Sequence, residues 1–76
     1  MRLISQDGYT DIPCEKFAIT LDISASYSII WAVSDKTKFA MASYSTSAKA
    51  LDALKQMRMR AYKVATYFRF PQDEEV

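Results

Sequence analysis

The chain has 76 residues, half of them apolar, and a formal net charge of +1 at pH 7. This length leaves room for one domain, and the apolar content is typical of a folded domain rather than of a disordered segment. No stretch approaches the roughly 20 consecutive apolar residues of a membrane-spanning helix, so the sequence predicts no transmembrane segment.

Features of the N-terminus and of cysteine usage indicate the compartment. The segment "MRLISQDG" has one basic residue and a two-residue apolar step, so we expect no signal peptide. Cys14 is the single cysteine, so no disulfide can form within the chain, which fits a reducing compartment. We therefore expect a soluble, cytoplasmic protein. Small domains without disulfides are often completed by self-association or by a partner.

The first elements along the chain are predicted to form a short hairpin. "RLIS" and "YTDIP" flank "QDG", and Asp7-Gly8 is a good turn signal because glycine tolerates positive φ. Pro13 is expected to end the second strand or to lie at a sheet edge.

Three longer strands follow, within residues 17–24, 27–34 and 38–44. "FAITLDIS", "YSIIWAVS" and "KFAMASY" alternate in side-chain character with a period of two, as half-buried strands do. The links "SAS" and "SDKT" are short, and short links join antiparallel neighbours. We predict a three-stranded antiparallel meander.

The same alternation predicts which face of the meander is buried. We expect the larger side chains, including Trp31 and the phenylalanines, to face the core. The opposite face is small and mildly polar, and the residues that would form a flat interface there are Ala18, Thr20, Ser28, Ala32, Ala40 and Ala42. Such a face can be solvated, or it can pack closely on another sheet and support a homo-oligomer.

A helix is predicted at about residues 46–63, because good helix formers dominate "STSAKALDALKQMRMRAYKVA". Ser45 or Thr46 can cap its N-terminus, but no glycine or proline marks its end. The apolar positions that recur at helical spacing are Ala50, Leu51, Leu54, Met57 and Ala61, with Ala65 as a further candidate. "TYFRF" then returns to period two, and Pro71 stops this last strand.

Together these elements predict an α+β domain over residues 1–71. Its antiparallel β-sheet would combine the N-terminal hairpin, the meander and the C-terminal strand, with one α-helix packed on one face. Residues 72–76 are predicted to be an acidic C-terminal tail. This tail could fray as a solubilising end, fold back toward the basic helix, or act as an anionic handle for a partner.

The residue types leave few catalytic arrangements open. The chain has no histidine, one cysteine and one glycine, which argues against imidazole-based catalysis, a cysteine-rich zinc site and a glycine-rich phosphate loop. Asp7, Asp11 and Glu15 are close in sequence, but a solvated rim near a turn is the simpler interpretation. We therefore predict no enzyme, no cofactor and no metal site.

The basic segment is the strongest indication of function. Lys55, Arg58, Arg60 and Lys63, with Arg69 nearby, form a candidate contact surface for phosphates. However, Arg58 and Arg60 are two positions apart and do not share one helix face, and the pI of about 7.8 is low for a nucleic-acid binder. The simpler interpretation is a solvated helix face whose charge is partly balanced by the acidic tail.

Several short motifs occur in an informative order. They are "ISQDG", "DIP", "YSTSAKALDALKQMR" followed by "AY", and "FRFPQDEEV". This set resembles a family of small proteins encoded by phages and prophages of Gram-positive bacteria. Those proteins open with I-S-Q-D-G, continue with D-x-P-Y, begin a helix with Y-S-T-x-E-K-A, and close with F-x-F-P and acidic residues. The resemblance covers both ends and the helix, about half of the chain.

Three features depart from the family pattern. Cys14 stands where tyrosine is usual, Ala48 and its neighbours lack the glutamate that would complete a capping box with Ser45, and helix and last strand join almost directly. The resemblance implies a mobile-element origin and a setting in the host cell cytoplasm. It implies no particular activity and carries over no catalytic residue.

Three hypotheses of function follow. The first is a non-enzymatic phage or prophage protein that binds a protein, either itself or a host or defence factor that it inhibits. The second is a nucleic-acid-binding accessory protein that uses the basic helix. The third is a binder of a phosphate-containing small ligand at an oligomer interface, where Arg58, Arg60 or Arg69 would meet the phosphate.

Overall fold

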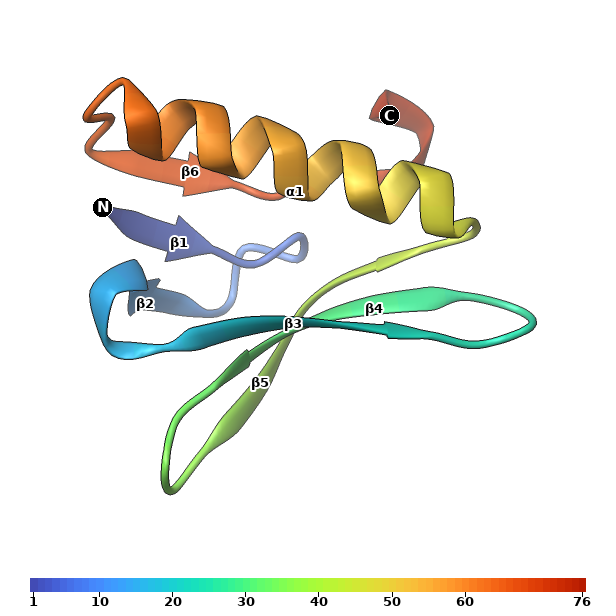
Figure 1. Ribbon diagram of the computed structural model, residues 1–76, viewed down its shortest axis with the longest axis horizontal. Helices are drawn as coiled ribbons and strands as arrows, with labels where there is room; N and C mark the ends of the chain where they lie inside the picture. Colours follow the sequence, from blue (N-terminus) through green and yellow to red (C-terminus); the bar gives the residue numbers. More distant parts are fainter.

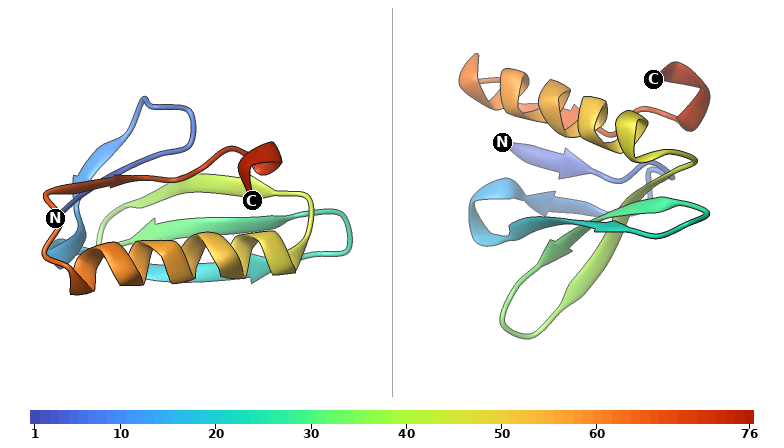
Figure 2. Two further views of the ribbon diagram at one scale, coloured as in Figure 1. Left: turned by 90° about the horizontal axis from the view of Figure 1, so that it is seen from above. Right: turned by 45° about the vertical axis from the view of Figure 1, so that its right-hand side comes forward.

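The computed structural model describes all 76 residues and confirms an α+β domain of six strands, one α-helix and two short 3₁₀ helices (Figure 1). The strands form two three-stranded sheets, ordered β3-β4-β5 and β2-β1-β6. The helix α1 runs alongside β6 and packs on β4 and β5, as the views in Figure 2 show from two further sides.

The predicted antiparallel meander is confirmed. β3 (Ala18–Ile23), β4 (Ser28–Val33) and β5 (Lys38–Tyr44) are antiparallel neighbours joined by tight turns. The ladder between β4 and β5 is irregular in the middle, because Ile30 pairs with Ala42 whereas Trp31 pairs with Ala40. Met41 is therefore an extra residue in β5, a β-bulge, which changes the direction of the strand.

The predicted buried face of β4 is wrong. Ser28, Ile30 and Ala32 are buried, whereas Trp31 and its neighbours in alternate positions are only half-buried on the outer face. Alternation identifies the two faces of a strand but not which face meets the helix. The helix presents fully buried small residues such as Ala50 here, so small side chains on both elements allow close packing.

The small-residue face predicted from the sequence is therefore split between two sides of the sheet. Ser28, Ala32 and Ala42 are buried on the core side, whereas Ala18, Thr20 and Ala40 are exposed. The register puts Ala32 opposite Ile19, so the inner face mixes large and small residues. The β-bulge also contributes to the wrong prediction of this face. Strict alternation would bury only one of two adjacent residues, but at the bulge Met41 and Ala42 are both buried.

The second sheet has β1 (Arg2–Ile4) between β2 (Asp11–Pro13) and β6 (Tyr67–Arg69). The predicted hairpin of β1 and β2 is confirmed, with Gly8 at φ 82° in its turn. β6 pairs with β1 in parallel, which differs from the predicted antiparallel sheet. A parallel pair needs a long connection, and here the meander and the helix supply it. Period-two alternation cannot reveal strand direction.

The helix α1 (Ser47–Tyr62) agrees with the prediction to within one residue at each end. The Thr46 hydroxyl oxygen accepts a hydrogen bond from Lys49 N at 3.2 Å and caps the first turn. The helix ends at Tyr62, and two residues later Val64, with a φ of 57°, turns the chain away while Val64 N donates to Ala61 O. A residue in this left-handed conformation after a helix is usually glycine. Because valine occupies the position here, the sequence contains no recognisable signal for the end of the helix. α1 is too short and too polar to cross a bilayer.

One core joins both sheets to the helix. Its fully buried side chains include Leu3 from β1, Ile30 from β4 and Phe70 after β6. Of the predicted helix positions, Leu51 and Ala61 are exposed instead of buried, and Leu51 keeps 53% of its surface. Leu51 lies at the margin of the apolar face, whereas Ala61 continues the buried stripe into the last turn of the helix, where nothing covers it.

The acidic C-terminus folds back onto the first turn of α1. The Asp73 carboxylate accepts hydrogen bonds from Ser45 N at 2.8 Å and from Lys49 Nζ at 3.4 Å. Residues Asp73–Glu75 form a 3₁₀ turn, and Val76 packs on the core. Of the three arrangements expected for the tail, the structure shows this one, although the partner is the start of the helix and not its more basic second half.

Candidate functional site

The segments that carry the family resemblance meet at one place. The Gln6 side chain accepts from Ser43 N and donates to Ser43 O, both at 3.1 Å, and also donates to Pro71 O. The Tyr44 hydroxyl donates to the same Pro71 carbonyl at 2.8 Å. We call the contacts among Gln6, Ser43, Tyr44 and Pro71 the closure junction, because they join β5 to both ends of the chain.

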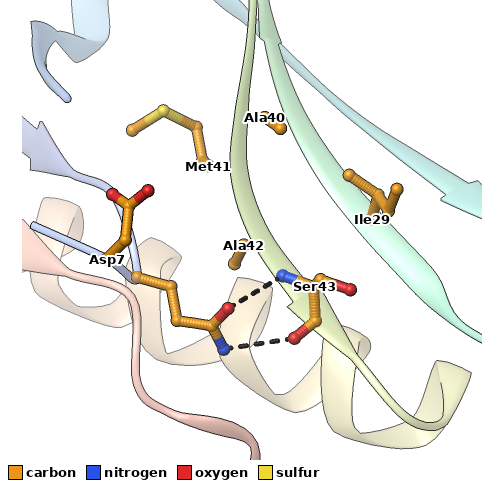
Figure 3. Close-up of a pocket in the computed structure, with 7 residues that line it drawn as sticks. Asp7, Ile29, Ala40, Met41, Ala42 and Ser43 are labelled. Atoms are coloured by element: carbon orange, nitrogen blue, oxygen red, sulfur yellow. Dashed lines mark hydrogen bonds between the residues drawn. The ribbon is translucent and has the colours of Figure 1, made fainter. Parts of the chain in front are cut away.

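A shallow hollow of about 200 Å³ lies beside the closure junction (Figure 3). Its polar groups are already engaged: Gln6 binds Ser43, and the Asp7 carboxylate accepts from Ser5 Oγ and from Tyr9 N. The Ser5 hydroxyl contributes most to lowering the pKa of Asp7. Binding pockets for small molecules are usually larger, about 300–1,000 Å³, and present free polar groups. This hollow therefore offers little to a ligand.

The three N-terminal carboxylates do not converge on one site. Asp11 pairs with Arg2 at 2.8 Å, and Glu15 binds the ammonium group of Met1, which lowers the pKa of Glu15. Asp7 stays within its own turn. No group of three or more acidic, cysteine or histidine side chains lies close enough together to hold a metal ion. These carboxylates have structural partners.

The five basic residues proposed as one contact surface occupy three places. Arg60 and Lys63 border a hollow of about 210 Å³ on the β6 side of α1, together with Met59 and Phe68. Arg69 points to the other side of β6, where its guanidinium donates to Gln6 O at 3.3 Å. Including Arg69 in this surface was therefore wrong, since adjacent strand residues face opposite sides.

Lys55 and Arg58 lie on the outward face of α1, together with exposed apolar side chains. Leu51 and Met59 keep 53% and 51% of their surface, and Tyr62 keeps 91%. Leu51, Lys55, Met59 and Tyr62 follow one another at intervals of four, four and three positions. These intervals place the four residues on one stripe of the helix. We call Leu51, Lys55, Arg58, Met59 and Tyr62 the helix surface.

The apolar part of the helix surface was not predicted from the sequence. Leu51 was assigned to the core, and Tyr62 received no role. The only available signal was the excess of large apolar residues over what one buried stripe of a helix can hold. None of the ion pairs in the structure involves Lys55, Arg58, Arg60 or Lys63, so the charge of these residues is not balanced within the fold.

The outer face of the meander is a second unusual surface. Trp31 is half-buried there, with Lys38 Nζ 4.1 Å from its ring centroid, a cation–π contact. Trp31 Nε1 is buried and has no hydrogen-bond partner. Because Lys38 and the neighbouring strands already cover the ring, this face is less available than the helix surface.

Comparison with known proteins identified no relative. No family model, no curated protein and no solved structure matches this chain.

Proposed function

We propose that the chain is a non-enzymatic phage or prophage protein that binds a host protein in the host cytoplasm and inhibits it. The helix surface is the binding site in this proposal. The observation that carries it is the coincidence of three large, exposed apolar side chains with two unpaired bases on one helix face. The partner would present an acidic, partly apolar patch.

The composition of the helix surface favours a protein partner. Tyrosine, methionine and arginine are enriched in protein interfaces, and tyrosine and arginine often dominate their binding energy. Large apolar residues spaced along one helix stripe are typical anchors of a helix that docks in a groove. A phosphate backbone would make little use of Leu51 and Met59, both of them about half exposed.

The test is affinity capture from bacterial lysate with matched variants, each protein compared by quantitative mass spectrometry. Tyr62→Ala should reduce the captured partner at least tenfold, because truncation of an interface anchor commonly costs about 2 kcal/mol or more. Tyr9→Ala is the matched control, since Tyr9 is 92% exposed and lies in the β1–β2 turn. Equal loss in both variants, or no loss in Tyr62→Ala, would contradict the proposed site.

A charge variant separates the two components of the surface. Arg58→Glu should weaken capture and make the residual binding less sensitive to salt, whereas Lys36→Glu in the β4–β5 turn should leave it unchanged. If the two variants behave alike, the net charge of the protein governs capture, and the helix surface is not the site.

Nucleic-acid binding is the second candidate function. The observation in its favour is the hollow bordered by Arg60 and Lys63, two bases that no ion pair within the fold balances and that could contact phosphates. Fluorescence anisotropy with labelled single-stranded and duplex DNA and RNA tests it. Salt-dependent binding that Arg60→Glu abolishes would support it, and no binding at low salt would exclude it.

A phosphate ligand held jointly by Arg58, Arg60 and Arg69 is not favoured. Arg69 lies on the far side of β6 and donates to the Gln6 carbonyl, whereas Arg60 borders the hollow beside α1. One phosphate bound within one chain cannot contact both.

A further inference from the structure

β3 is an edge strand with an open row of backbone groups. Its only neighbour in the sheet is β4. Ser24 N donates to Tyr27 O in the connecting turn, which makes this pair a hydrogen-bonded one. Because antiparallel pairs alternate, Thr20 and Asp22 direct their N–H and C=O groups toward β4, whereas Ile19, Leu21 and Ile23 direct theirs outward.

The apolar face of β3 is also incompletely covered. Phe17, Ile19, Leu21 and Ile23 follow the strict alternation of a core strand, yet none of them is buried, and Ile23 keeps 59% of its surface. α1 packs on β4 and β5 and leaves β3 at the margin. The strand contains no lysine, proline or bulge, and Asp22 is its only charged residue, so few of the devices that protect an edge from further pairing are present.

We propose that β3 pairs antiparallel with β3 of a second copy of this chain, with Thr20 on the two-fold axis. In this register Ile19 of each copy lies opposite Leu21 of the other, and their outward N–H and C=O groups bond reciprocally. The two helices stay on the same side of the joined sheet. The uncovered apolar residues of the two copies then meet and bury one another.

Charge complementarity favours a second copy in antiparallel orientation as the occupant of this edge. Lys16 precedes β3 and Asp22 lies near its end, and neither takes part in an ion pair within the chain. The antiparallel two-fold places Asp22 opposite Ala18 of the second copy, beside the 3₁₀ turn Cys14–Lys16 that leads into β3, and so brings Asp22 toward that copy's Lys16. A register centred on Leu21 would also keep the faces aligned, but it would set the two Asp22 carboxylates diagonally against each other. A second copy thus supplies the missing strand and the missing countercharges.

Hydrogen exchange of backbone amides, measured by NMR across a dilution series, tests the pairing directly. At low concentration the Ile19 and Leu21 amides should exchange fast while those of Thr20 and Asp22, bonded to β4, stay protected. At millimolar concentration Ile19 and Leu21 should become protected as the mass from light scattering approaches that of a dimer. A monomeric mass with these two amides unprotected at every concentration would overturn the proposal.

A charge swap tests the antiparallel pairing of the two copies. Lys16→Glu and Asp22→Lys should each raise the dimer dissociation constant about threefold to tenfold. The double variant should restore it, because both pairs between residue 16 of one copy and residue 22 of the other are re-formed with reversed charges. Neither change affects an ion pair within the fold, so thermal unfolding of the dilute monomer should be unchanged. If the dimer dissociation constant is the same in all three variants as in the wild type, the contact lies elsewhere and the proposal is overturned.

A different occupant of the edge gives a distinct result. A short peptide of alternating Val and Thr is the probe for a foreign strand. If it protects Ile19 and Leu21 in a protein that stays monomeric when concentrated, the edge accepts foreign strands and not a second copy, which also overturns the proposal.

Discussion

The two sheets of this domain are held together in different ways. The meander has strands of six or seven residues joined by long backbone ladders, and its only internal side-chain hydrogen bond is from Ser24 Oγ to Tyr27 O. The sheet of β1, β2 and β6 has strands of only three residues. Side chains such as Gln6 and Arg2 provide many of its bonds.

Strand length explains this difference. A three-residue strand offers too few ladder bonds to offset the entropy lost when its backbone is fixed, so other groups must hold it. The closure junction is the largest set of such groups. The comparison therefore predicts that losing one polar side chain is costly at the junction and cheap in the meander.

Gln6→Ala should have the largest effect. It removes the amide that bonds both backbone groups of Ser43 and the Pro71 carbonyl, so the free energy of unfolding should fall by about 2 kcal/mol. Urea denaturation measures this. Gln56→Ala is the matched control, because Gln56 bonds only Asp52 one turn away on the helix and should cost a few tenths of a kcal/mol. Equal losses would mean that the bonds of the closure junction stabilise the fold no more than one local side-chain bond on α1.

Tyr44→Phe should cost about 1–2 kcal/mol, because the buried hydroxyl loses its bond to Pro71 O. The variant should also change how the free energy of unfolding depends on pH under alkaline conditions. Burial, together with the carboxylates of Asp73 and Glu75, raises the pKa of Tyr44 above its ordinary value of 10.0. The folded state therefore holds the proton more tightly, so wild-type stability falls as pH rises above about 10.

Thermal unfolding between pH 8 and pH 11 checks this expectation. The difference between wild type and Tyr44→Phe should narrow as the pH passes about 10, because the variant has no phenol to ionise at this position. A constant difference across the whole range would show that Tyr44 ionises equally easily in both states.

The same contrast between long and short strands explains which parts of the fold could be predicted from the sequence. The meander was correctly predicted because alternation over six residues is a local signal. The helix was also predicted, and its cap is Thr46, one of the two candidates. The parallel pairing of β1 with β6 was not, because three residues carry no directional information and their partners are more than 60 positions away. The inverted β4 face shows the remaining limit: which side of a strand is buried depends on where the helix lies.

The candidate site was predicted less well than the fold. Lys55 and Arg58 were recognised by charge, but the apolar residues beside them became visible only when the core proved too narrow to hold Leu51. The motifs "ISQDG", "YST" and "FRFPQDEEV" gave no functional residue because they build the closure junction. Their shared role depends on contacts over 27 to 65 positions, which sequence spacing does not reveal.

Asp73→Asn should weaken the attachment of the C-terminus to α1 with a smaller effect than the two junction variants. The bond from Ser45 N contributes most to lowering the pKa of Asp73, and Lys49 adds to it. A carboxyl whose folded-state pKa is lowered stabilises the fold above its unfolded value near 4, and this stabilisation is lost as pH falls below it. The variant should therefore match the wild type at pH 2 and be less stable at pH 7, in thermal unfolding. A difference that persists at pH 2 would mean that packing, not charge, is lost.

Trp31→Phe should have the smallest effect and is the meander counterpart of Tyr44→Phe, since each removes one polar hydrogen from an aromatic side chain. The Tyr44 hydroxyl has an acceptor, whereas Trp31 Nε1 is buried without one. Removing an unpartnered donor relieves a desolvation cost, which offsets the lost ring area and the weaker contact with Lys38. We expect a change within about 0.5 kcal/mol by urea denaturation. A loss as large as that of Tyr44→Phe would mean that Nε1 finds an acceptor in solution, and polar side chains would then hold both sheets alike.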